Sequence, residues 1–190
     1  MTYRILVVCT GNICRSPMGE IVLHDKLAAA GITDVEVGSA GVSAEESGHP
    51  IDRRAENVLQ NAGYRVPGFH NAHRATRREL READLVLAMT VGHARALYRM
   101  MKEAGADTSK IHLWREFDGT INPAPNGAFG EGGPLEGQEK ARSRPGYDFY
   151  TSDGVLDVLD PWYGDQGGFY GTLGVVERGA DGIIAWIPKN

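Results

Sequence analysis

Residues 8–17, VCTGNICRSP, place a cysteine, a glycine and an arginine in one short turn near the start of the chain. A loop that leads from a strand into a helix N-terminus points several backbone N–H groups at one spot, and the helix dipole adds positive potential. Such a loop binds an oxyanion such as phosphate, and the planar fork of Arg15 can bind two phosphate oxygens. The stretch therefore predicts an anion site with Cys9 at its mouth.

Cys9 has the position of a nucleophile in this predicted site. The field that attracts phosphate also favours the thiolate form of a cysteine, and a thiolate can attack a bound phosphoryl group. Gly11 permits close approach of the backbone, and Asn12 tolerates the left-handed conformation that such a loop requires. The spacing of Cys9 and Arg15 alone is a weak signal, because free cysteines at strand ends are often simply buried. The order of strand, glycine, arginine and Ser-Pro helix start favours the chemical interpretation.

The predicted chemistry also needs an acid. Phosphoryl transfer to a thiolate leaves an alkoxide or phenolate that must be protonated, so a carboxylic acid should face the cysteine. The candidate is Asp160 in residues 159–165, LDPWYGD, an aromatic and proline-stiffened loop before the last predicted helix. In isolation an Asp-Pro pair is only a turn signal. Asp165 is the next candidate for the acid.

The elements that must position these residues alternate along the chain. Apolar, β-branched runs predict strands at residues 3–8, 35–39, 84–89 and 111–114. Helical spacing, with Pro near one start and Gly after two of the ends, predicts helices at residues 16–30, 51–62 and 91–103. A last helix follows from an apolar stripe of Val176, Ala180, Ile183, Ile184 and Ile187. This alternation predicts a parallel sheet with helices on both faces and a ligand site beyond the carboxyl ends of the strands.

Three other segments have local signals. Thr76 and Glu79 resemble the capping box of a short helix. Four arginines share one face of that helix by their spacing, which predicts a solvated surface: Arg74, Arg77, Arg78 and Arg81. Residues 119–146 are rich in Gly and Pro and have no usable periodicity, so we interpret them as a mobile insertion within a single domain of residues 1–190.

The composition limits the class of protein. With 190 residues, 42% hydrophobic and 24% charged, the chain has the length and balance of one globular domain with a full core. The formal net charge of −5 argues against nucleic-acid binding, and no apolar run approaches the ~18 residues of a membrane span. The N-terminus lacks a signal-peptide pattern, and two cysteines five residues apart do not indicate a disulfide scaffold. We expect a cytoplasmic, monomeric enzyme.

VCTGNICRSP and the distant DPWYGD together resemble the low-molecular-weight protein tyrosine phosphatase family. The resemblance extends to SAG at 39–41, GHPIDRRA at 48–55, the segment from His70 to Ala72 and DLVLAM at 84–89. With it we expect an α/β fold with a four-stranded parallel sheet in the flavodoxin-like order 2-1-3-4. The resemblance implies hydrolysis of phosphotyrosine through a phosphocysteine on Cys9. It assigns phosphate binding to Arg15 and the role of general acid to Asp160.

The resemblance also implies roles for the neighbours of these three residues. The residues expected to contact phosphate or substrate are Thr10, Gly11, Asn12, Ile13, Cys14, Ser16, Glu45, Trp162 and Tyr163. Asn12, Ser16 and His70 match residues that brace the loop, and Cys14 matches a cysteine that pairs reversibly with the nucleophile under oxidation. No cofactor or metal is implied. The expected partner is a phosphotyrosine-containing protein, with a bacterial tyrosine kinase as one candidate.

The chain departs from the family pattern at four positions. Glu45 stands where the family commonly has an aromatic residue beside the substrate. Thr90 replaces an Asp after the third strand, His73 replaces an Arg, and Trp162 stands where animal members have Tyr. Glu45 leaves the chemistry intact, but it changes what the pattern says about substrate preference.

Other functions share parts of these motifs. Arsenate reductases of this fold need a further cysteine, and this chain has two cysteines in total. Arginine phosphatases resemble the loop closely but have Thr where this chain has Ile13, which favours phosphotyrosine. A redox-regulated phosphoprotein-binding module would lack the nucleophile or the acid, and both Cys9 and Asp160 are present.

Overall fold

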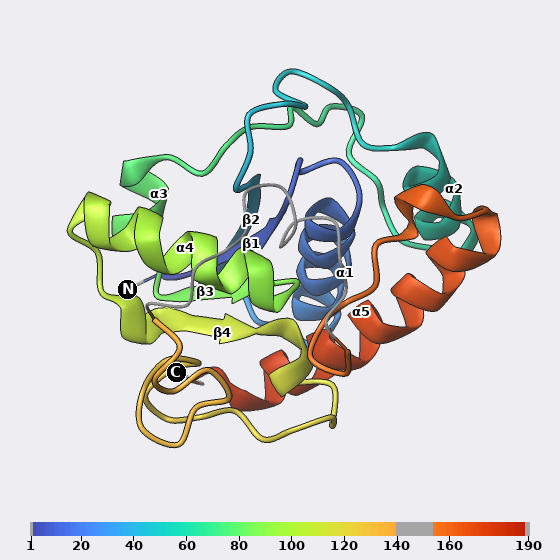
Figure 1. Cartoon of the computed structure of the whole chain (residues 1–190). Helices are drawn as coiled ribbons and strands as arrows, with labels where there is room; N and C mark the ends of the chain where they lie inside the picture. Colours follow the sequence, from blue (N-terminus) through green and yellow to red (C-terminus); the bar gives the residue numbers. More distant parts are fainter. Residues whose placement is uncertain (1, 140–153, 189–190) are drawn as a thin grey trace.

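Four parallel strands form the centre of the structure, a computed structural model that describes residues 2–139 and 154–188 (Figure 1). The strands are β1 (Tyr3–Cys9), β2 (Val35–Gly41), β3 (Leu85–Ala88) and β4 (Ile111–Leu113). They pair in parallel in the order β2-β1-β3-β4. The predicted α/β class and the predicted 2-1-3-4 order are therefore confirmed.

The strand that ends in Cys9 has a partner on each side. Its register aligns Cys9 with Gly41 of β2 and Val8 with Ala88 of β3. Residues 5–9 of this strand are all buried. Cys9 therefore stands at the carboxyl edge of the inner part of the sheet, which is where sheets of this kind bind ligands.

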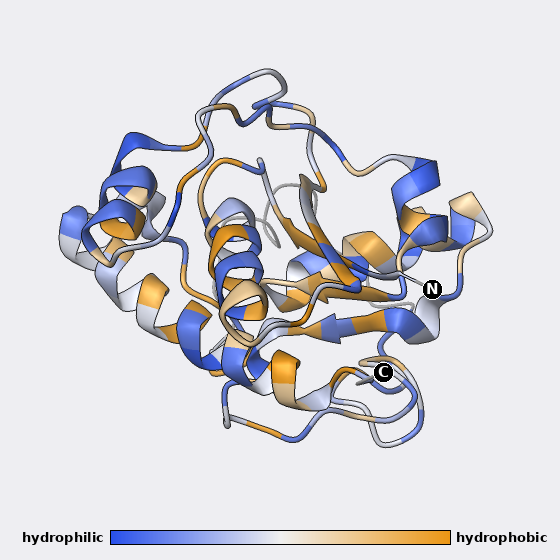
Figure 2. Cartoon of the chain, turned by 180° about the vertical axis from the view of Figure 1, so that it is seen from behind, coloured by the Kyte–Doolittle hydropathy of each residue, from blue (hydrophilic) through white to orange (hydrophobic). Residues whose placement is uncertain are grey.

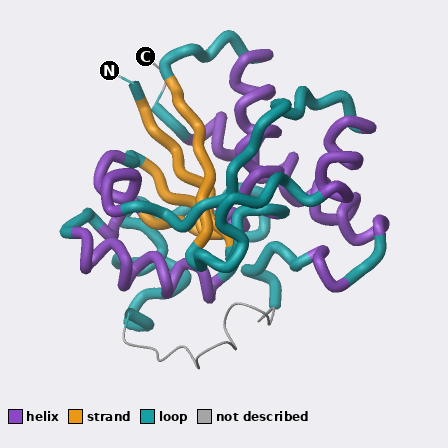
Figure 3. The backbone as a smooth tube through the Cα atoms, turned by 90° about the horizontal axis from the view of Figure 1, so that it is seen from above, coloured by secondary structure: helices purple, strands orange, loops and turns teal. Residues whose placement is uncertain are grey.

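Helices cover both faces of the sheet, as Figures 1 and 3 show. One face packs against α1 (Arg15–Ala29), α2 (Arg53–Asn61) and α5 (Gln166–Trp186). The other face packs against α3 (Arg77–Glu82) and α4 (Val91–Ala104). Successive residues of a strand point to opposite faces, so Val7 enters the first core and Val8 the second. Figure 2 shows the hydrophobic strands enclosed between helices whose outer sides are hydrophilic.

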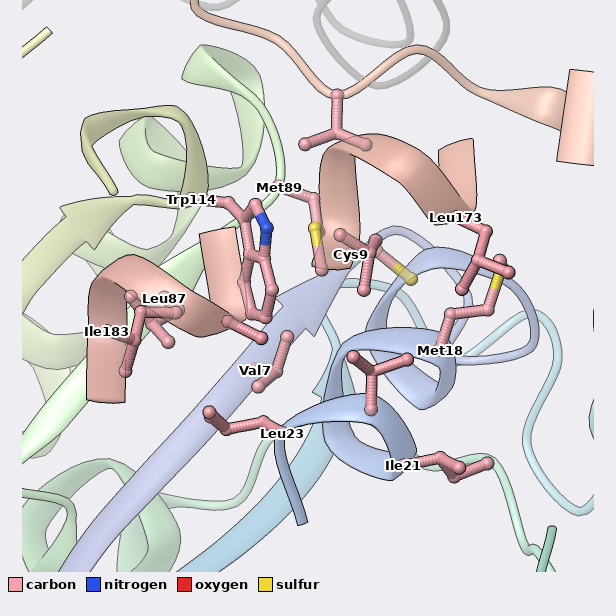
Figure 4. Packing of buried hydrophobic residues seen from close by; sticks show 14 of the residues in the cluster. Val7, Cys9, Met18, Ile21, Leu23, Leu87, Met89, Trp114, Leu173 and Ile183 are labelled. Carbon is pink, nitrogen blue, oxygen red and sulfur yellow. The ribbon is translucent and has the colours of Figure 1, made fainter. Parts of the chain in front are cut away.

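Figure 4 shows the first core, in which the side chain of Cys9 lies among apolar neighbours from β1, α1 and α5. Met18, Leu23, Trp114 and Ile183 are almost completely buried in this core. Burying a side chain of the size of Leu or Ile stabilises the fold by about 1.5–3 kcal/mol. The base of the predicted site is therefore continuous with the first hydrophobic core.

Capping residues fix where the helices begin. The side chain of Asp52 accepts a hydrogen bond from the backbone N–H of Arg54, so α2 begins at Arg53 rather than at the predicted residue 51. Thr76 and Glu79 form the predicted capping box of α3. Arg74 corrects one prediction, because it precedes α3 and its Nε donates to the carbonyl of Val42 at 3.1 Å. The four arginines therefore do not share one helix face, although all four are exposed.

The predicted apolar stripe of the last helix packs into the first core. Val176, Ala180 and Ile183 of α5 are buried, Ile184 is half-buried, and Ile187 is buried directly after the helix ends. α5 is 21 residues long. Across residues 2–139 and 154–188, no helix has the combination of length and apolar composition that a membrane span needs.

Residues 119–139, the described part of the predicted insertion, have no helix or strand but are packed onto the fold. Ala128, Phe129 and Leu135 are buried in the second core, and the Tyr98 and Phe129 rings lie 4.8 Å apart. This part of the predicted insertion is therefore attached to the fold by three apolar side chains. The rest of the prediction, residues 140–146, lies outside the described residues.

Candidate active site

Residues 9–16, which we call the phosphate loop, connect β1 to α1. The loop is held against the end of β2, because the backbone N–H of Val42 donates to the Cys9 carbonyl at 2.9 Å and that of Ser43 to the Thr10 carbonyl at 3.0 Å. A Cβ atom at Gly41 would lie 2.5 Å from the Thr10 carbonyl oxygen. A glycine at position 41 is therefore needed for this close approach.

Asn12 organises the interior of the phosphate loop. Its φ of 60° makes it the one non-glycine residue with positive φ in the part of the chain that the structure describes, and it is completely buried. The Nδ2 group donates to the hydroxyls of Ser16 at 3.0 Å and Ser39 at 2.9 Å. Oδ1 accepts from the backbone N–H of His73 at 3.2 Å, and the Asn12 carbonyl accepts from His70 Nε2 at 2.7 Å. These contacts connect Asn12 with Ser16 and His70, the three residues for which a bracing role is predicted.

The two cysteines of the loop have different surroundings. Cys9 Sγ lies 3.1 Å from the hydroxyl of Ser16, which is also 3.2 Å from the carbonyl of Ala40. The single hydroxyl hydrogen of Ser16 can therefore be donated to the sulfur of Cys9 or to that carbonyl. Burial raises the pKa of the Cys14 thiol, and the negative charge of Asp52 raises it further. Cys14 consequently stays a neutral thiol, and both cysteines are free.

Arg15 and Asp160 form an ion pair, with Nη2 of the arginine 2.9 Å from Oδ2 of the aspartate. Arg15 is only 3% exposed, and its Nη1 also donates to the carbonyl of Val158 at 3.1 Å. Asp160 precedes a short 3-10 turn, Pro161–Tyr163, and its Oδ1 accepts from the backbone N–H of Trp162. The predicted phosphate ligand and the predicted acid are therefore in direct contact.

Residues 157–165, which we call the acid loop, are attached to the end of the sheet at their beginning. The buried carboxylate of Asp157 accepts a hydrogen bond from the backbone N–H of Val91 at 2.7 Å, at the start of α4. The backbone N–H of Val158 donates to the carbonyl of Met89 at 2.8 Å. The sequence did not identify Asp157, because its partner is 66 residues away and no local pattern marks such a contact.

One pocket of about 210 Å³ brings the predicted residues together. Its lining consists of Cys9, Thr10, Gly11, Ile13, Cys14, Arg15, Glu45, Glu46, Asp160, Trp162 and Tyr163. Asn12 and Ser16 do not line it, and their contact with phosphate stays a prediction. The sequence did not indicate Glu46 as a lining residue. Glu46 packs closely against the phosphate loop, because a Cβ atom at Gly11 would lie only 2.7 Å from Glu46 Cγ. Within the described residues, no group of three or more His, Cys, Asp or Glu side chains is placed to hold a metal ion.

Comparison with known proteins decides the family. Residues 4–125 match the model of the low molecular weight phosphotyrosine protein phosphatases. The chain is 36% identical to a low molecular weight protein-tyrosine-phosphatase of Streptomyces coelicolor, over 100% of this chain and 96% of that protein. This chain belongs to the low-molecular-weight protein-tyrosine-phosphatase family. It is a phosphoric monoester hydrolase of the protein-tyrosine-phosphatase class.

Two solved structures resemble the phosphatase over almost its whole length. Wzb of Vibrio vulnificus, in complex with benzylphosphonate, has a TM-score of 0.70 and 26% identity, and the match covers 98% of this chain and 100% of that one. The YwlE arginine phosphatase of Geobacillus stearothermophilus has a TM-score of 0.68 and 27% identity, with 96% and 91% covered. Proteins similar to this chain therefore include both a protein-tyrosine-phosphatase and an arginine phosphatase.

A buried histidine that the sequence did not single out supports the phosphate loop of the phosphatase. His93, in the first turn of α4, is completely buried, and its Nε2 lies 2.8 Å from the hydroxyl of Thr10. Burial, and then the charge of Arg15, lowers the pKa of His93 well below its ordinary value. The hydroxyl of Thr10 in the phosphate loop therefore contacts a neutral imidazole rather than a second cation.

Two departures from the family pattern have structural roles. Thr90, in the place of an Asp, caps α4 by accepting the backbone N–H of His93 at 3.1 Å. His73, in the place of an Arg, lies 2.8 Å from a carboxylate oxygen of Glu79 while its backbone N–H holds Asn12. Thr90 and His73 each make a contact that orients a neighbour of the phosphate loop.

Proposed function

We propose that the phosphatase hydrolyses phosphotyrosine in proteins through a phosphocysteine on Cys9, with Arg15 as phosphate ligand and Asp160 as general acid. The observation that carries the proposal is the meeting of all three side chains in one pocket, with Arg15 and Asp160 2.9 Å apart. Cys9 ends β1 at the base of this pocket, and the loop that follows it leads into the N-terminus of α1. These are the parts that phosphoryl transfer to a thiolate requires.

In the first step, the sulfur of Cys9 attacks phosphorus, an S–P bond forms and the P–O bond to the tyrosine breaks. The electron pair leaves with the phenolic oxygen, which takes its proton from Asp160. The backbone N–H groups of the phosphate loop and the fork of Arg15 hold the equatorial oxygens, where charge accumulates. In the second step the oxygen of a water molecule attacks phosphorus, a P–O bond forms and the S–P bond breaks. Asp160 accepts a proton from the water, inorganic phosphate leaves, and the thiolate of Cys9 is restored.

The ion pair between Arg15 and Asp160 links substrate binding to this proton transfer. A phosphoryl dianion bound to Arg15 competes with Asp160 for the same guanidinium. Substrate binding therefore releases Asp160 from Arg15, so that its carboxyl group can reach the leaving oxygen.

Replacement of the acid by an amide tests the assignment of Asp160. Asp160→Asn should lower kcat/KM for phenyl phosphate by about 100-fold or more, because phenolate is a poor leaving group that needs the proton. The loss for p-nitrophenyl phosphate should be less than about tenfold, since nitrophenolate departs without help. Equal losses for the two substrates would place the acid elsewhere, with Asp165 as the next variant to measure.

Arginine dephosphorylation is the second candidate function, because the YwlE arginine phosphatase shares the fold at 27% identity. Ile13, whose side chain lines the pocket, favours phosphotyrosine. An apolar wall suits an aromatic ring, whereas it leaves the N–H groups of a phosphoguanidinium without a partner. The test compares hydrolysis of matched phosphotyrosine and phosphoarginine peptides by the wild type and by Ile13→Thr. Faster hydrolysis of phosphoarginine by the wild type would replace the proposed substrate.

The location, oligomeric state, cofactor requirement and partners of the enzyme stay predictions from the sequence. We expect a monomeric, cytoplasmic phosphatase that uses no cofactor or metal and binds neither nucleic acid nor membranes. A bacterial tyrosine kinase is our candidate for the phosphotyrosine protein that it dephosphorylates. Incubating the phosphatase with an autophosphorylated kinase of this type, and following loss of phosphotyrosine by immunoblot, tests this substrate.

A further inference from the structure

We infer that Arg54 is a positioning residue that fixes the acid loop relative to the phosphate loop, and so sets the place from which Asp160 donates its proton. Arg54 lies in α2 and touches none of the reacting groups in the pocket. The inference rests on the proposed role of Asp160 as general acid. It adds to that role the residue that keeps Asp160 in reach.

On one side, Arg54 is attached to the phosphate loop through Asp52. The backbone N–H of Asp52 donates to the carbonyl of Ile13 at 2.8 Å. The carboxylate of Asp52 accepts from Arg54 Nε at 3.1 Å with one oxygen and from Nη2 at 3.1 Å with the other. Two parallel hydrogen bonds of this kind fix the plane of the guanidinium as well as its place.

On the other side, Arg54 binds the acid loop. Its Nη1 donates to the carbonyls of Trp162 and Gly164, each at 3.2 Å. Trp162 lies within the 3-10 turn that Asp160 caps at its beginning, and Gly164 caps the end of the same turn. A third contact runs in the reverse direction, because Gln166 Nε2 donates to the backbone carbonyl of Arg54 at 3.1 Å. The guanidinium therefore joins the two loops.

Aromatic packing holds the guanidinium in this place. Its central carbon lies 5.2 Å from the centre of the Trp162 ring and 4.7 Å from the centre of the Phe169 ring, and Phe169 is completely buried. Both distances lie within the range of cation–π attraction. Burial alone would raise the pKa of Asp52, but its hydrogen bonds to Arg54 lower it overall. The pair therefore stays ionised near neutral pH.

The acid loop needs such a support because its tip is exposed. The turn is three residues long, and Trp162 and Tyr163 are 42% and 69% exposed. A general acid must lie about 2.6–3.2 Å from the atom that it protonates. A misplacement of about 1 Å can cost about 100-fold in rate. Loss of Arg54 should therefore act on proton donation rather than on phosphate binding.

The experiment compares Arg54→Gln and Arg54→Lys with Arg53→Gln as the matched control. Arg53 is the neighbouring, exposed arginine of α2 and lies outside the pocket. For both Arg54 variants, kcat/KM should fall about 10- to 100-fold for phenyl phosphate but less than about threefold for p-nitrophenyl phosphate. The inhibition constant for inorganic phosphate should stay within about twofold. Arg53→Gln should match the wild type in all three measurements.

Arg54→Lys separates position from charge. The lysine keeps the positive charge near Asp160 but lacks the planar fork that can bind Asp52 and the two carbonyls together. Full activity of Arg54→Lys toward phenyl phosphate would overturn the inference, because charge alone would then suffice. An equal loss for the two aryl phosphates, or no loss, in Arg54→Gln would overturn it as well.

A double variant tells failure of this inference from failure of the proposed function. In an Asp160→Asn background, Arg54→Gln should have little further effect on phenyl phosphate, because the acid that it positions is gone. If Asp160→Asn alone shows no dependence on the leaving group, the proposed function fails. Further loss in the double variant equal to that in the single variant would overturn the inference alone. Asp52→Asn, which keeps a capping residue for α2, provides a second route if Arg54→Gln does not fold, with the same pattern expected.

Discussion

The two loops of the active site are held in place by opposite means. The phosphate loop follows a strand paired on both sides, and its bracing residues Asn12 and Ser16 are completely buried. The acid loop projects from the sheet, and its tip is kept in place by Arg15 and by Arg54 of α2. The loop that we propose to bind the phosphoryl group is therefore part of the core, whereas the loop that we propose to deliver the proton is attached to it from outside.

Because the two loops are held differently, we expect mutations in them to have different effects on stability and on chemistry. A rigid set of donors stabilises charge in a transition state without reorganising, so the phosphate loop gains from burial. In the proposed mechanism Asp160 gives up its ion pair with Arg15 when substrate binds, so the acid loop gains from contacts that can be released. Substitutions in the phosphate loop should accordingly affect both the stability of the fold and the rate of the reaction. Substitutions at the tip of the acid loop should affect mainly the rate of the reaction.

Loss of the nucleophile should give the largest effect. Cys9→Ser should lower hydrolysis of a phosphotyrosine peptide by more than about 1,000-fold, because the hydroxyl of serine is a far weaker nucleophile than a thiolate. Inorganic phosphate should still bind, since its ligands are Arg15 and the backbone of the loop. Steady-state rates and calorimetric titration with phosphate provide the two measurements. Turnover within about tenfold of the wild type would remove Cys9 from the mechanism.

Two variants of Asn12 distinguish the energetic cost of its left-handed backbone from the contribution of its side-chain hydrogen bonds. Asn12→Ala should destabilise the fold by about 2–4 kcal/mol, because it removes buried hydrogen bonds and forces a Cβ residue without local compensation into the left-handed region. Asn12→Gly loses the same side-chain contacts but accepts the positive φ, so it should cost about 1 kcal/mol less. Urea unfolding of both variants measures the difference. Equal stabilities would show that the left-handed backbone at residue 12 is without cost.

The sequence predicted the parts of this comparison unequally. The phosphate loop could be predicted because a strand, a glycine, an arginine and Ser-Pro follow one another in the sequence. The capping box of α3 could be predicted because Thr76 and Glu79 are three residues apart. The contacts of Asp157 and Arg54 were missed, since each joins residues 66 or more positions apart. The burial of Phe129 was missed for the same reason, because its ring packs against Tyr98 of α4, which is distant in the sequence. Periodicity describes an element and its neighbours in sequence, but not which loop comes to lie against it.

His73 makes the support of the phosphate loop sensitive to pH. Burial alone would lower the pKa of His73, but its hydrogen bond to Glu79 raises it above the ordinary value near 6.5. A raised pKa stabilises the fold fully below that ordinary value, and this stability is lost as the pH rises through the pKa in the folded state. Between pH 6 and pH 9, the wild type should therefore lose more stability than His73→Gln. Parallel pH dependence of the two proteins in urea unfolding would contradict this.

Glu45 should give the smallest effect, on substrate binding alone. It lines the pocket together with Trp162 and Tyr163, and it is exposed. An aromatic contact is worth about 0.5–1.5 kcal/mol, so Glu45→Trp should lower KM for an aryl phosphate about two- to tenfold with kcat little changed. Glu45→Gln is the control that removes the charge without adding a ring. An unchanged KM in both variants would show that Glu45 does not contact the substrate.

The packing of residues 119–139 has a consequence for solubility. β4 is an outer strand of the sheet, and unpaired strand edges recruit other chains into aggregates. At this edge, the backbone N–H of Ala128 donates to the carbonyl of Ile111 at 2.7 Å, and the buried side chain of Phe129 follows directly. At the opposite edge, residues 73–75 bind both the N–H and the carbonyl of Gly41 at the end of β2. Loop segments therefore occupy outer backbone groups at Ile111 of β4 and at Gly41 of β2, and these groups cannot template the addition of another strand.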